Sequence, residues 1–257
     1  MKYVRVLTKD AEAYGLLDGH SINLLSGEPW EGATEIGITI STRDAKFLAP
    51  CNPSKVIGVA ANYPGVSGSS RKDEEPLIFA KSTNSVCGHD NPITSRFLEL
   101  SVWGEPELAI VLGKTLTNAS ENESLDAIFG YSVANDVTCM NWGLRDHHLA
   151  RSKCADSFCP LGPYIDTQFD PGEKRISGYQ NGRLIRDGFL NTRIFNEVEL
   201  LTRLSKWITL EPGDVVLTGA PARTGERTFL QDGDLYRCEI EGLGSLQNRF
   251  AQGAVHV

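Results

Sequence analysis

Residues 103–113 of this 257-residue chain read WGEPELAIVLG, in which two glutamates precede an unbroken apolar run. A short apolar run rich in branched residues predicts a buried β-strand. Residues i and i+2 of an extended chain project to the same side, so Glu105 and Glu107 should lie side by side where that strand begins. Two adjacent carboxylates repel each other unless a cation relieves them, and oxygen ligands suit Mg²⁺ or Mn²⁺. Two solvated glutamates on an edge strand marked by Pro106 are the alternative, which the spacing alone favours.

Two downstream residues could complete a cation site. Asp136 closes an apolar run over residues 131–135, so it either points into a cleft or caps the strand through an Asx turn. Lys153 lies in a segment of mixed polarity, where a lysine is most often solvated. Partly buried beside a metal, Lys153 would instead fix an anionic substrate group or transfer a proton. Spacing alone leaves these alternatives open.

The pattern along the chain predicts a mainly β protein with a few helices. Residues 1–50 read as short strands, with an Asp18-Gly19 turn between two of them, and are expected to form a small β-rich N-terminal domain. Residues 51–257 are expected to form the main domain, which opens with the apolar run KVIGVAA. Residues 64–75 are polar, rich in Gly and Ser and without periodicity, as is typical of a lid over a site.

Composition and charge exclude several classes of partner. The chain has 25 basic and 33 acidic residues and a formal net charge of −8, which argues against a protein that binds nucleic acids or membrane surfaces. No run reaches the ~18 apolar residues that a membrane-spanning helix needs, and no signal peptide is visible. The six cysteines include no CxxC pair, so we expect reduced thiols and a cytoplasmic location.

Six short motifs occur in a fixed order along residues 53–250. They are Pro53-Ser54-Lys55 with Asn62-Tyr63, Pro76 to Lys81, Glu105 and Glu107 with Asp136, Lys153 with Pro160 to Pro163, Asn181-Gly182 with Asn191-Thr192, and Gly213-Asp214 with Thr218-Gly219. In this order they resemble the catalytic domain of the fumarylacetoacetate hydrolase superfamily. The resemblance implies a mixed β-sandwich and β-roll catalytic domain, preceded here by the small β-rich appendage. It also favours the metal interpretation of the two glutamates.

The same resemblance implies a site and a chemistry. Glu105, Glu107 and Asp136 would bind Mg²⁺ or Mn²⁺, and the bound ion would stabilise the enolate of a small anionic 2-oxo acid substrate. Lys153 and Lys81 would be catalytic residues that also contact and orient the substrate. Further substrate contacts are implied for Thr218, Asn62 and Tyr63. Because family members generally form dimers, we expect a homodimer.

Two departures from the hydrolytic members of the family indicate a branch. Those members place a histidine just beyond the Asn-Tyr pair to activate water, whereas this chain has Val66 in that region. They also commonly place an arginine four residues after the metal aspartate, where this chain has Met140. The run from Lys153 to Gly162 instead resembles the branch that isomerises 2-hydroxyhepta-2,4-diene-1,7-dioate and decarboxylates 5-oxopent-3-ene-1,2,5-tricarboxylate.

The leading hypothesis is therefore a metal-dependent decarboxylase or isomerase of a 2-oxo or 2-hydroxydienoic dicarboxylic acid. A hydrolase of acylpyruvates or fumarylpyruvate is the first alternative, with Glu74 or Glu75 of the lid replacing the missing base. A family member that keeps the fold as a non-catalytic binding module is the second.

Overall fold

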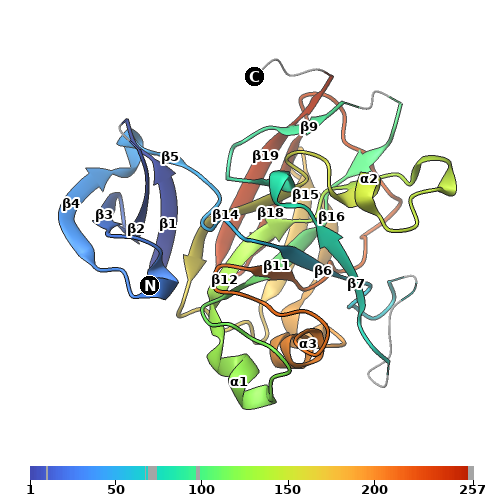
Figure 1. Cartoon of the computed structure of the whole chain (residues 1–257). Coiled ribbons are helices and arrows are strands. Elements are labelled where there is room, and N and C mark those ends of the chain that lie inside the picture. The colour runs from blue at the N-terminus through green and yellow to red at the C-terminus, as the bar shows by residue number, and fades with distance from the viewer. Residues whose placement is uncertain (10, 67, 69–73, 97–98, 254–257) are drawn as a thin grey trace.

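The computed structural model describes residues 1–9, 11–66, 68, 74–96 and 99–253, and only the backbone of Trp142. The predicted fold class is confirmed, because strands dominate the described chain and form two principal sheets (Figure 1). Side chains from both sheets meet in one core, which gives the fold its layered arrangement.

The strand β11 (Pro106–Leu112) lies inside the larger sheet, and all seven of its residues are buried. Its antiparallel neighbours are β12 (Ile128–Asn135) and β17 (Val215–Leu217). The sheet then continues from β17 to its parallel neighbour β6 (Val56–Ala60) and ends at β7 (Leu77–Lys81). A strand with neighbours on both edges and cover on both faces reads as a continuous apolar run, which explains the sequence of β11.

On the other side of β12, the larger sheet extends into the N-terminal strands. β14 (Cys159–Asp166) pairs with β12 and also, through Asp166 and Ile165, with β1 (Lys2–Leu7). The remaining strands of this sheet are β2 (Glu12–Asp18), β3 (Ser21–Leu25), β4 (Glu35–Ser41), β5 (Lys46–Phe47) beside β1, and β8 (Val86–Cys87) beside β14. The predicted turn at Asp18-Gly19 is confirmed by the pairing of Asp18 with Ser21. The first 50 residues therefore extend the main sheet (Figure 1).

The smaller sheet covers part of the larger one. Its strands are, in spatial order, β16 (Arg183–Phe189), β15 (Arg175–Gln180), β18 (Leu235–Ile240), β19 (Gly244–Gln252) and β9 (Ile93–Ser95). β15 and β16 form the predicted hairpin, in which Asn181 and Gly182 both have positive φ, of 49° and 79°. Such a turn matches the twist of the strands that it joins. Leu108 of β11 packs in the same core as Tyr236 of β18.

Short helices accompany the larger sheet. α3 (Glu197–Leu204) starts with a capping box between Asn196 and Glu199, and it packs Leu200, Leu201 and Leu204 against the sheet. α1 (Glu121–Asp126) lies beside α3 (Figure 1). The other short elements are α2 (Ala150–Lys153), the ribbon β10 (Val102–Trp103) with β13 (Thr138–Cys139), and the 3₁₀ turns η1 (Pro29–Glu31), η2 (Thr42–Asp44), η3 (Thr83–Ser85), η4 (Trp142–Leu144) and η5 (Leu190–Thr192).

Two observations bear on the expected environment of the protein. All six cysteines are free, as expected from their spacing. Within the described ranges, no helix combines the length and the apolar character that crossing a membrane would require.

Candidate active site

Sheet register brings the three predicted metal ligands to one cavity. β11 and β12 run antiparallel with Glu107 opposite Ala134, so the start of β11 lies beside the end of β12. Glu105, one residue before β11, accepts a hydrogen bond at its carbonyl from the Asp136 amide, with an N–O distance of 2.9 Å. Glu105, Glu107 and Asp136 all line a cavity of about 400 Å³. Strand pairing therefore brings Asp136 next to Glu105 and Glu107, which precede it by some 30 positions in the chain.

Lys153 at the end of α2 lines the same cavity, and its ammonium lies among these carboxylates. Its Nζ forms an ion pair with Asp136 Oδ2, lies 3.3 Å from Glu105 Oε2 and donates to Thr138 Oγ1 at 2.7 Å. The ring of Phe79 lies under it, with 4.5 Å between Nζ and the ring centroid. A buried ammonium with this many partners is held in one position.

Lys81 approaches Asp136 from the other side. Its fully buried Nζ lies 2.5 Å from Asp136 Oδ1 and donates to the carbonyl of Val137 at 3.2 Å. Asp136 thus bridges two lysines. Lys81 is absent from the described lining of the cavity, so it contacts the site through Asp136.

Burial and neighbouring charges shift the pKa values of Glu105 and Glu107 in opposite directions. Burial alone would raise the pKa of Glu105, but the charges of Lys153 and Arg186 outweigh it and lower that pKa to about 2. For Glu107, burial and then the negative charges of Asp136 and Glu105 raise the pKa well above its ordinary value. For Lys153, burial would lower the pKa, but Asp136 and Glu105 overcome it and raise the pKa. Glu107 is therefore the carboxylate whose charge is least compensated.

Gly219 supports Glu107 directly. Its N–H donates to Glu107 Oε2 at 2.7 Å. The backbone here has φ +90°, and a Cβ would lie 2.8 Å from Cβ of Asn62, so only glycine fits. The backbone donor thus fixes one oxygen of Glu107 at the cavity wall.

The chemistry of these donors fits a divalent cation, although they are not gathered around one point. Within the described part of the chain, no three His, Cys, Asp or Glu side chains converge closely enough to hold a metal. Lys153 supplies the positive charge between Asp136 and Glu105. The three carboxylates nevertheless share one cavity, and the raised pKa of Glu107 reflects its burial first and then the negative charges of Asp136 and Glu105 beside it. Hard oxygen donors such as carboxylates are what Mg²⁺ and Mn²⁺ prefer.

The side chains of three predicted substrate-binding residues lie outside the described cavity lining. The hydroxyl of buried Thr218 donates to the carbonyl of Leu108 at 3.1 Å, which ties β17 to β11. Tyr63 is buried in the core between the sheets. Neither of these side chains, nor that of Asn62, belongs to the described cavity lining. Asn62 and Thr218 thus support the cavity wall through hydrogen bonds to the backbone, and the substrate contacts expected of these residues stay a prediction.

Substitution of Asn62 separates support of the cavity wall from substrate binding. Its Nδ2 donates to the carbonyls of Thr218 at 2.8 Å and Phe195 at 3.0 Å, and its Oδ1 accepts from the Phe195 amide at 2.8 Å. Asn62→Ala should lower the free energy of unfolding by about 1–3 kcal/mol, because buried backbone groups lose their partners. Urea unfolding measures this, with Asn23→Ala as the matched control, because Asn23 Oδ1 accepts an exposed hydrogen bond from Thr39 Oγ1. A stable Asn62→Ala variant with impaired substrate binding would instead support the predicted substrate contact and contradict the supporting role.

The described part of the lid divides into two regions. Gly65 and Val66 line the cavity. Glu75 forms an ion pair with Arg203 of α3 at 3.1 Å, and the carbonyl of Glu74 accepts from the same guanidinium. Neither glutamate is part of the described lining, and residues 67 and 69–73 of the expected lid lie outside the described residues.

Three arginines in the cavity lining were missed by sequence reasoning. Arg186 of β16 is buried, and its guanidinium forms an ion pair with Glu105 and donates to the carbonyl of Pro221 at 2.7 Å. Arg223 and Arg227 come from the segment after β17. A basic residue within a half-buried hairpin strand was the available signal for Arg186, because buried charges require partners. Two arginines in a polar loop carry no such signal.

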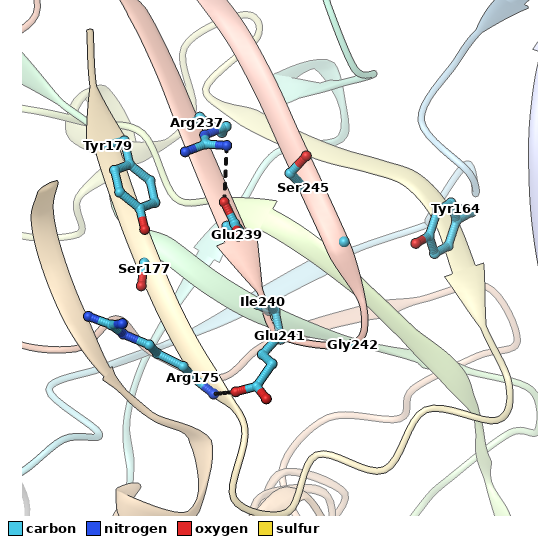
Figure 2. Close-up of a pocket in the computed structure, with 11 residues that line it drawn as sticks. Tyr164, Arg175, Ser177, Tyr179, Arg237, Glu239, Ile240, Glu241, Gly242 and Ser245 are labelled. Carbon is cyan, nitrogen blue, oxygen red and sulfur yellow. Dashed lines mark hydrogen bonds and ion pairs between the residues drawn. The ribbon is translucent and has the colours of Figure 1, made fainter. Parts of the chain in front are cut away.

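A second cavity, of about 690 Å³, lies over β15, β18 and β19 (Figure 2). Its charged residues already have partners: Arg237 pairs with Glu239 at 3.1 Å, and the Arg175 amide donates to Glu241 at 3.3 Å. The guanidinium of Arg175 pairs at 2.7 Å with Asp187, which lies outside the described lining. Nothing in it matches the convergence of carboxylates and lysines at the first cavity.

The sequence matches two models of known protein families. One, described as "Fumarylacetoacetate (FAA) hydrolase C-terminal", matches residues 55–251. The chain belongs to the fumarylacetoacetate hydrolase family. The other, described as "Rv2993c-like, N-terminal", matches residues 1–50. The resemblance inferred from the six motifs is thus confirmed.

Relatives within the fumarylacetoacetate hydrolase family include several named enzymes. "Oxaloacetate tautomerase fahd2, mitochondrial" from Xenopus laevis is 36% identical over 221 residues, which cover 81% of this chain and 69% of that protein. The solved 5-carboxymethyl-2-hydroxymuconate delta-isomerase from Mycobacterium smegmatis has a TM-score of 0.90 and 30% identity, and covers 98% of this chain and 100% of its own. The 2-hydroxyhepta-2,4-diene-1,7-dioate isomerase from Mycobacterium marinum has a TM-score of 0.90 and 29% identity, with coverage of 99% and 100%. This chain therefore shares its fold with enzymes named as isomerases.

Proposed function

We propose that this protein is a Mg²⁺- or Mn²⁺-dependent isomerase or decarboxylase of a 2-oxo or 2-hydroxydienoic dicarboxylic acid. One observation carries the proposal: three carboxylates and the buried ammonium of Lys153 line one cavity. The names of the relatives as isomerases and a tautomerase favour proton movement over hydrolysis. The region after Asn62-Tyr63 contains no histidine that could activate water for hydrolysis.

The chain's own residues divide the work. Glu105, Glu107 and Asp136 would hold the ion, which when bound supplies a Lewis acid that stabilises negative charge on the substrate oxygen. Lys153 Nζ keeps its proton because of its carboxylate neighbours, so it can donate a hydrogen bond to the developing enolate oxygen. In an isomerisation, a proton leaves the enol oxygen and one is gained at carbon. Decarboxylation instead breaks the C–C bond to a carboxylate, releases CO₂ and leaves the enolate of an acid that is shorter by one carbon. Val59 and Phe79 form part of the apolar wall that limits water.

An assay with oxaloacetate distinguishes isomerisation from decarboxylation in one sample. With saturating MgCl₂, the protein should accelerate decay of the ultraviolet absorbance of the enol by about 100-fold or more, the scale of a positioned proton donor. A chelator should abolish the acceleration, and release of CO₂ measures decarboxylation in the same sample. 2-Hydroxyhepta-2,4-diene-1,7-dioate is the second substrate to be tested.

Acetylpyruvate provides the contrasting outcome. Release of acetate and pyruvate from it, without isomerisation of the dicarboxylic acids, would overturn the proposal in favour of hydrolysis. Calorimetry with Mg²⁺ and oxalate distinguishes a non-catalytic member, which we expect to bind neither. The homodimer and the cytoplasmic location inferred from the sequence remain part of the proposal.

A further inference from the structure

The three arginines of the cavity lie on a hairpin strand and a loop that are joined to each other. Arg186 of β16 forms an isolated antiparallel bridge with Arg223, and its Nη1 donates to the carbonyl of Pro221. The same segment begins at Gly219, whose amide holds Glu107. The loop that carries Arg223 and Arg227 is therefore fixed to the carboxylate end of the cavity at two points.

Only one of the three arginines is neutralised. Arg186 pairs with Glu105. Among the residues that the structure describes, neither Arg223 nor Arg227 has a carboxylate within ion-pair distance, although both line the cavity. The guanidinium of Arg227 lies over the ring of Trp103, 4.2 Å from its centroid, in a cation–π contact. Both side chains remain exposed and can reach a ligand.

Electrostatics at this end of the cavity favour an anion. Partial burial first, and then the positive charges of Arg223 and Arg186, lower the pKa of Arg227. The described lining contains three acidic side chains and four basic ones, so it has a positive excess of one in a chain whose net charge is −8. The basic residues are Lys153, Arg186, Arg223 and Arg227. A divalent ion at the carboxylates would increase that excess, which suits a ligand with two negative charges.

We propose that Arg223 and Arg227 bind the second carboxylate of the substrate, the one remote from its 2-oxo acid group. The inference rests on the proposed function for the position of the 2-oxo acid group. Planar guanidinium groups bind carboxylates through paired hydrogen bonds, so this end of the cavity would select dicarboxylic over monocarboxylic acids. Arg186 has a different role: it positions Glu105 and the arginine-bearing loop.

Matched ligands isolate the second carboxylate. 2-Oxoglutarate and 2-oxopentanoate differ only in whether a terminal carboxylate or a methyl group follows the same chain, and 2-oxoadipate extends the reach by one methylene. In calorimetric titrations with saturating MgCl₂, the wild-type protein should bind one of the diacids about 10- to 100-fold more tightly than 2-oxopentanoate. Arg223→Gln with Arg227→Gln should remove this preference and leave the affinity for 2-oxopentanoate unchanged.

Two controls make the outcomes decisive. Arg237→Gln removes one positive charge outside this cavity and should preserve the preference. Oxalate lacks a remote carboxylate, so its affinity should be equal in wild type and double variant, which also shows that the variant is folded. No preference in the wild-type protein, or a preference that survives in the double variant, would overturn the inference. A protein that shows the arginine-dependent preference but turns over no 2-oxo acid refutes the proposed function alone.

Discussion

Glu107→Gln is expected to abolish metal-dependent turnover and, at the same time, to stabilise the metal-free protein near neutral pH. Substitution of supporting residues around metal sites already costs about 10- to 100-fold, so loss of a ligand should reduce kcat/KM by more than about 100-fold. The free energy of unfolding of the metal-free protein should rise, because the buried Glu107 carboxylate faces the negative charges of Asp136 and Glu105. Glutamine has the same shape without that charge.

The sign of the stability change follows from the raised pKa of Glu107. The folded protein retains a proton that the unfolded chain releases above pH 4.5, the ordinary value, so the wild type loses stability as the pH rises through this window. Glutamine removes this loss. In urea unfolding with a chelator present, the variant should exceed the wild type near about pH 7, and the two should converge toward about pH 4.

Glu35→Gln on the exposed strand β4 is the matched control, and it should change neither activity nor stability measurably. Full activity in Glu107→Gln would sink the metal assignment. A variant that is less stable than the wild type without metal would instead show that Glu107 is paired more favourably than its surroundings indicate.

Lys153→Met is expected to cause the largest loss of stability of any single substitution in the site. The ammonium compensates Asp136 and Glu105, both of which line the cavity, and Asp136 is almost completely buried. Removing one partner of a buried ion pair costs about 3–5 kcal/mol. Asp136 then keeps its ion pair with Lys81 and Glu105 keeps its ion pair with Arg186, so each carboxylate loses part of its compensation. Activity should be lost as well, because the substrate oxygen loses its proton donor.

The pH dependence distinguishes this effect from lost packing. In the wild type, Lys153 and Arg186 outweigh the effect of burial and hold the pKa of Glu105 at about 2, below its ordinary 4.5. A lowered carboxylate pKa gives stability that is present above 4.5 and is lost as the pH falls toward about 2. The difference between wild type and Lys153→Met should therefore shrink on acidification.

Lys114→Met provides the comparison for Lys153→Met. Lys114 also forms an ion pair, with Asp126, but both side chains are more than half exposed. Its removal should cost less than about 1 kcal/mol at any pH. Equal effects at the two positions would contradict the central charge-compensating role of Lys153.

The part of the site that follows from local pattern could be predicted from the sequence. The apolar run after Glu107 identified β11, and i, i+2 spacing placed Glu105 and Glu107 together. The convergence of these glutamates with Asp136 required the family resemblance, because it depends on the pairing of β11 with β12. Strand register is a long-range property that spacing along one strand does not contain.

Other residues in and around the site could be placed only by the tertiary structure. Asn62 and Thr218 are polar residues near the end of an apolar strand, a pattern that suits both a ligand contact and a hydrogen bond to the backbone. Only the tertiary structure decides between these. Arg223 and Arg227 were missed for the converse reason, since a loop arginine is ordinarily solvated and acquires a role only when the fold brings it to a cavity.

The sheet order of β11 also affects how the protein is made. One edge of this apolar strand is paired with β12, which follows soon after it in the chain, but the other edge receives β17 only when Val215 to Leu217 have been synthesised. Until then a nascent chain exposes unpaired backbone groups along a strongly apolar strand, which is a template for association with other chains. The segment that carries two of the proposed metal ligands is thus also a liability during translation. Because of this topology, β11 must be protected from other chains until β17, in the last third of the protein, has been synthesised.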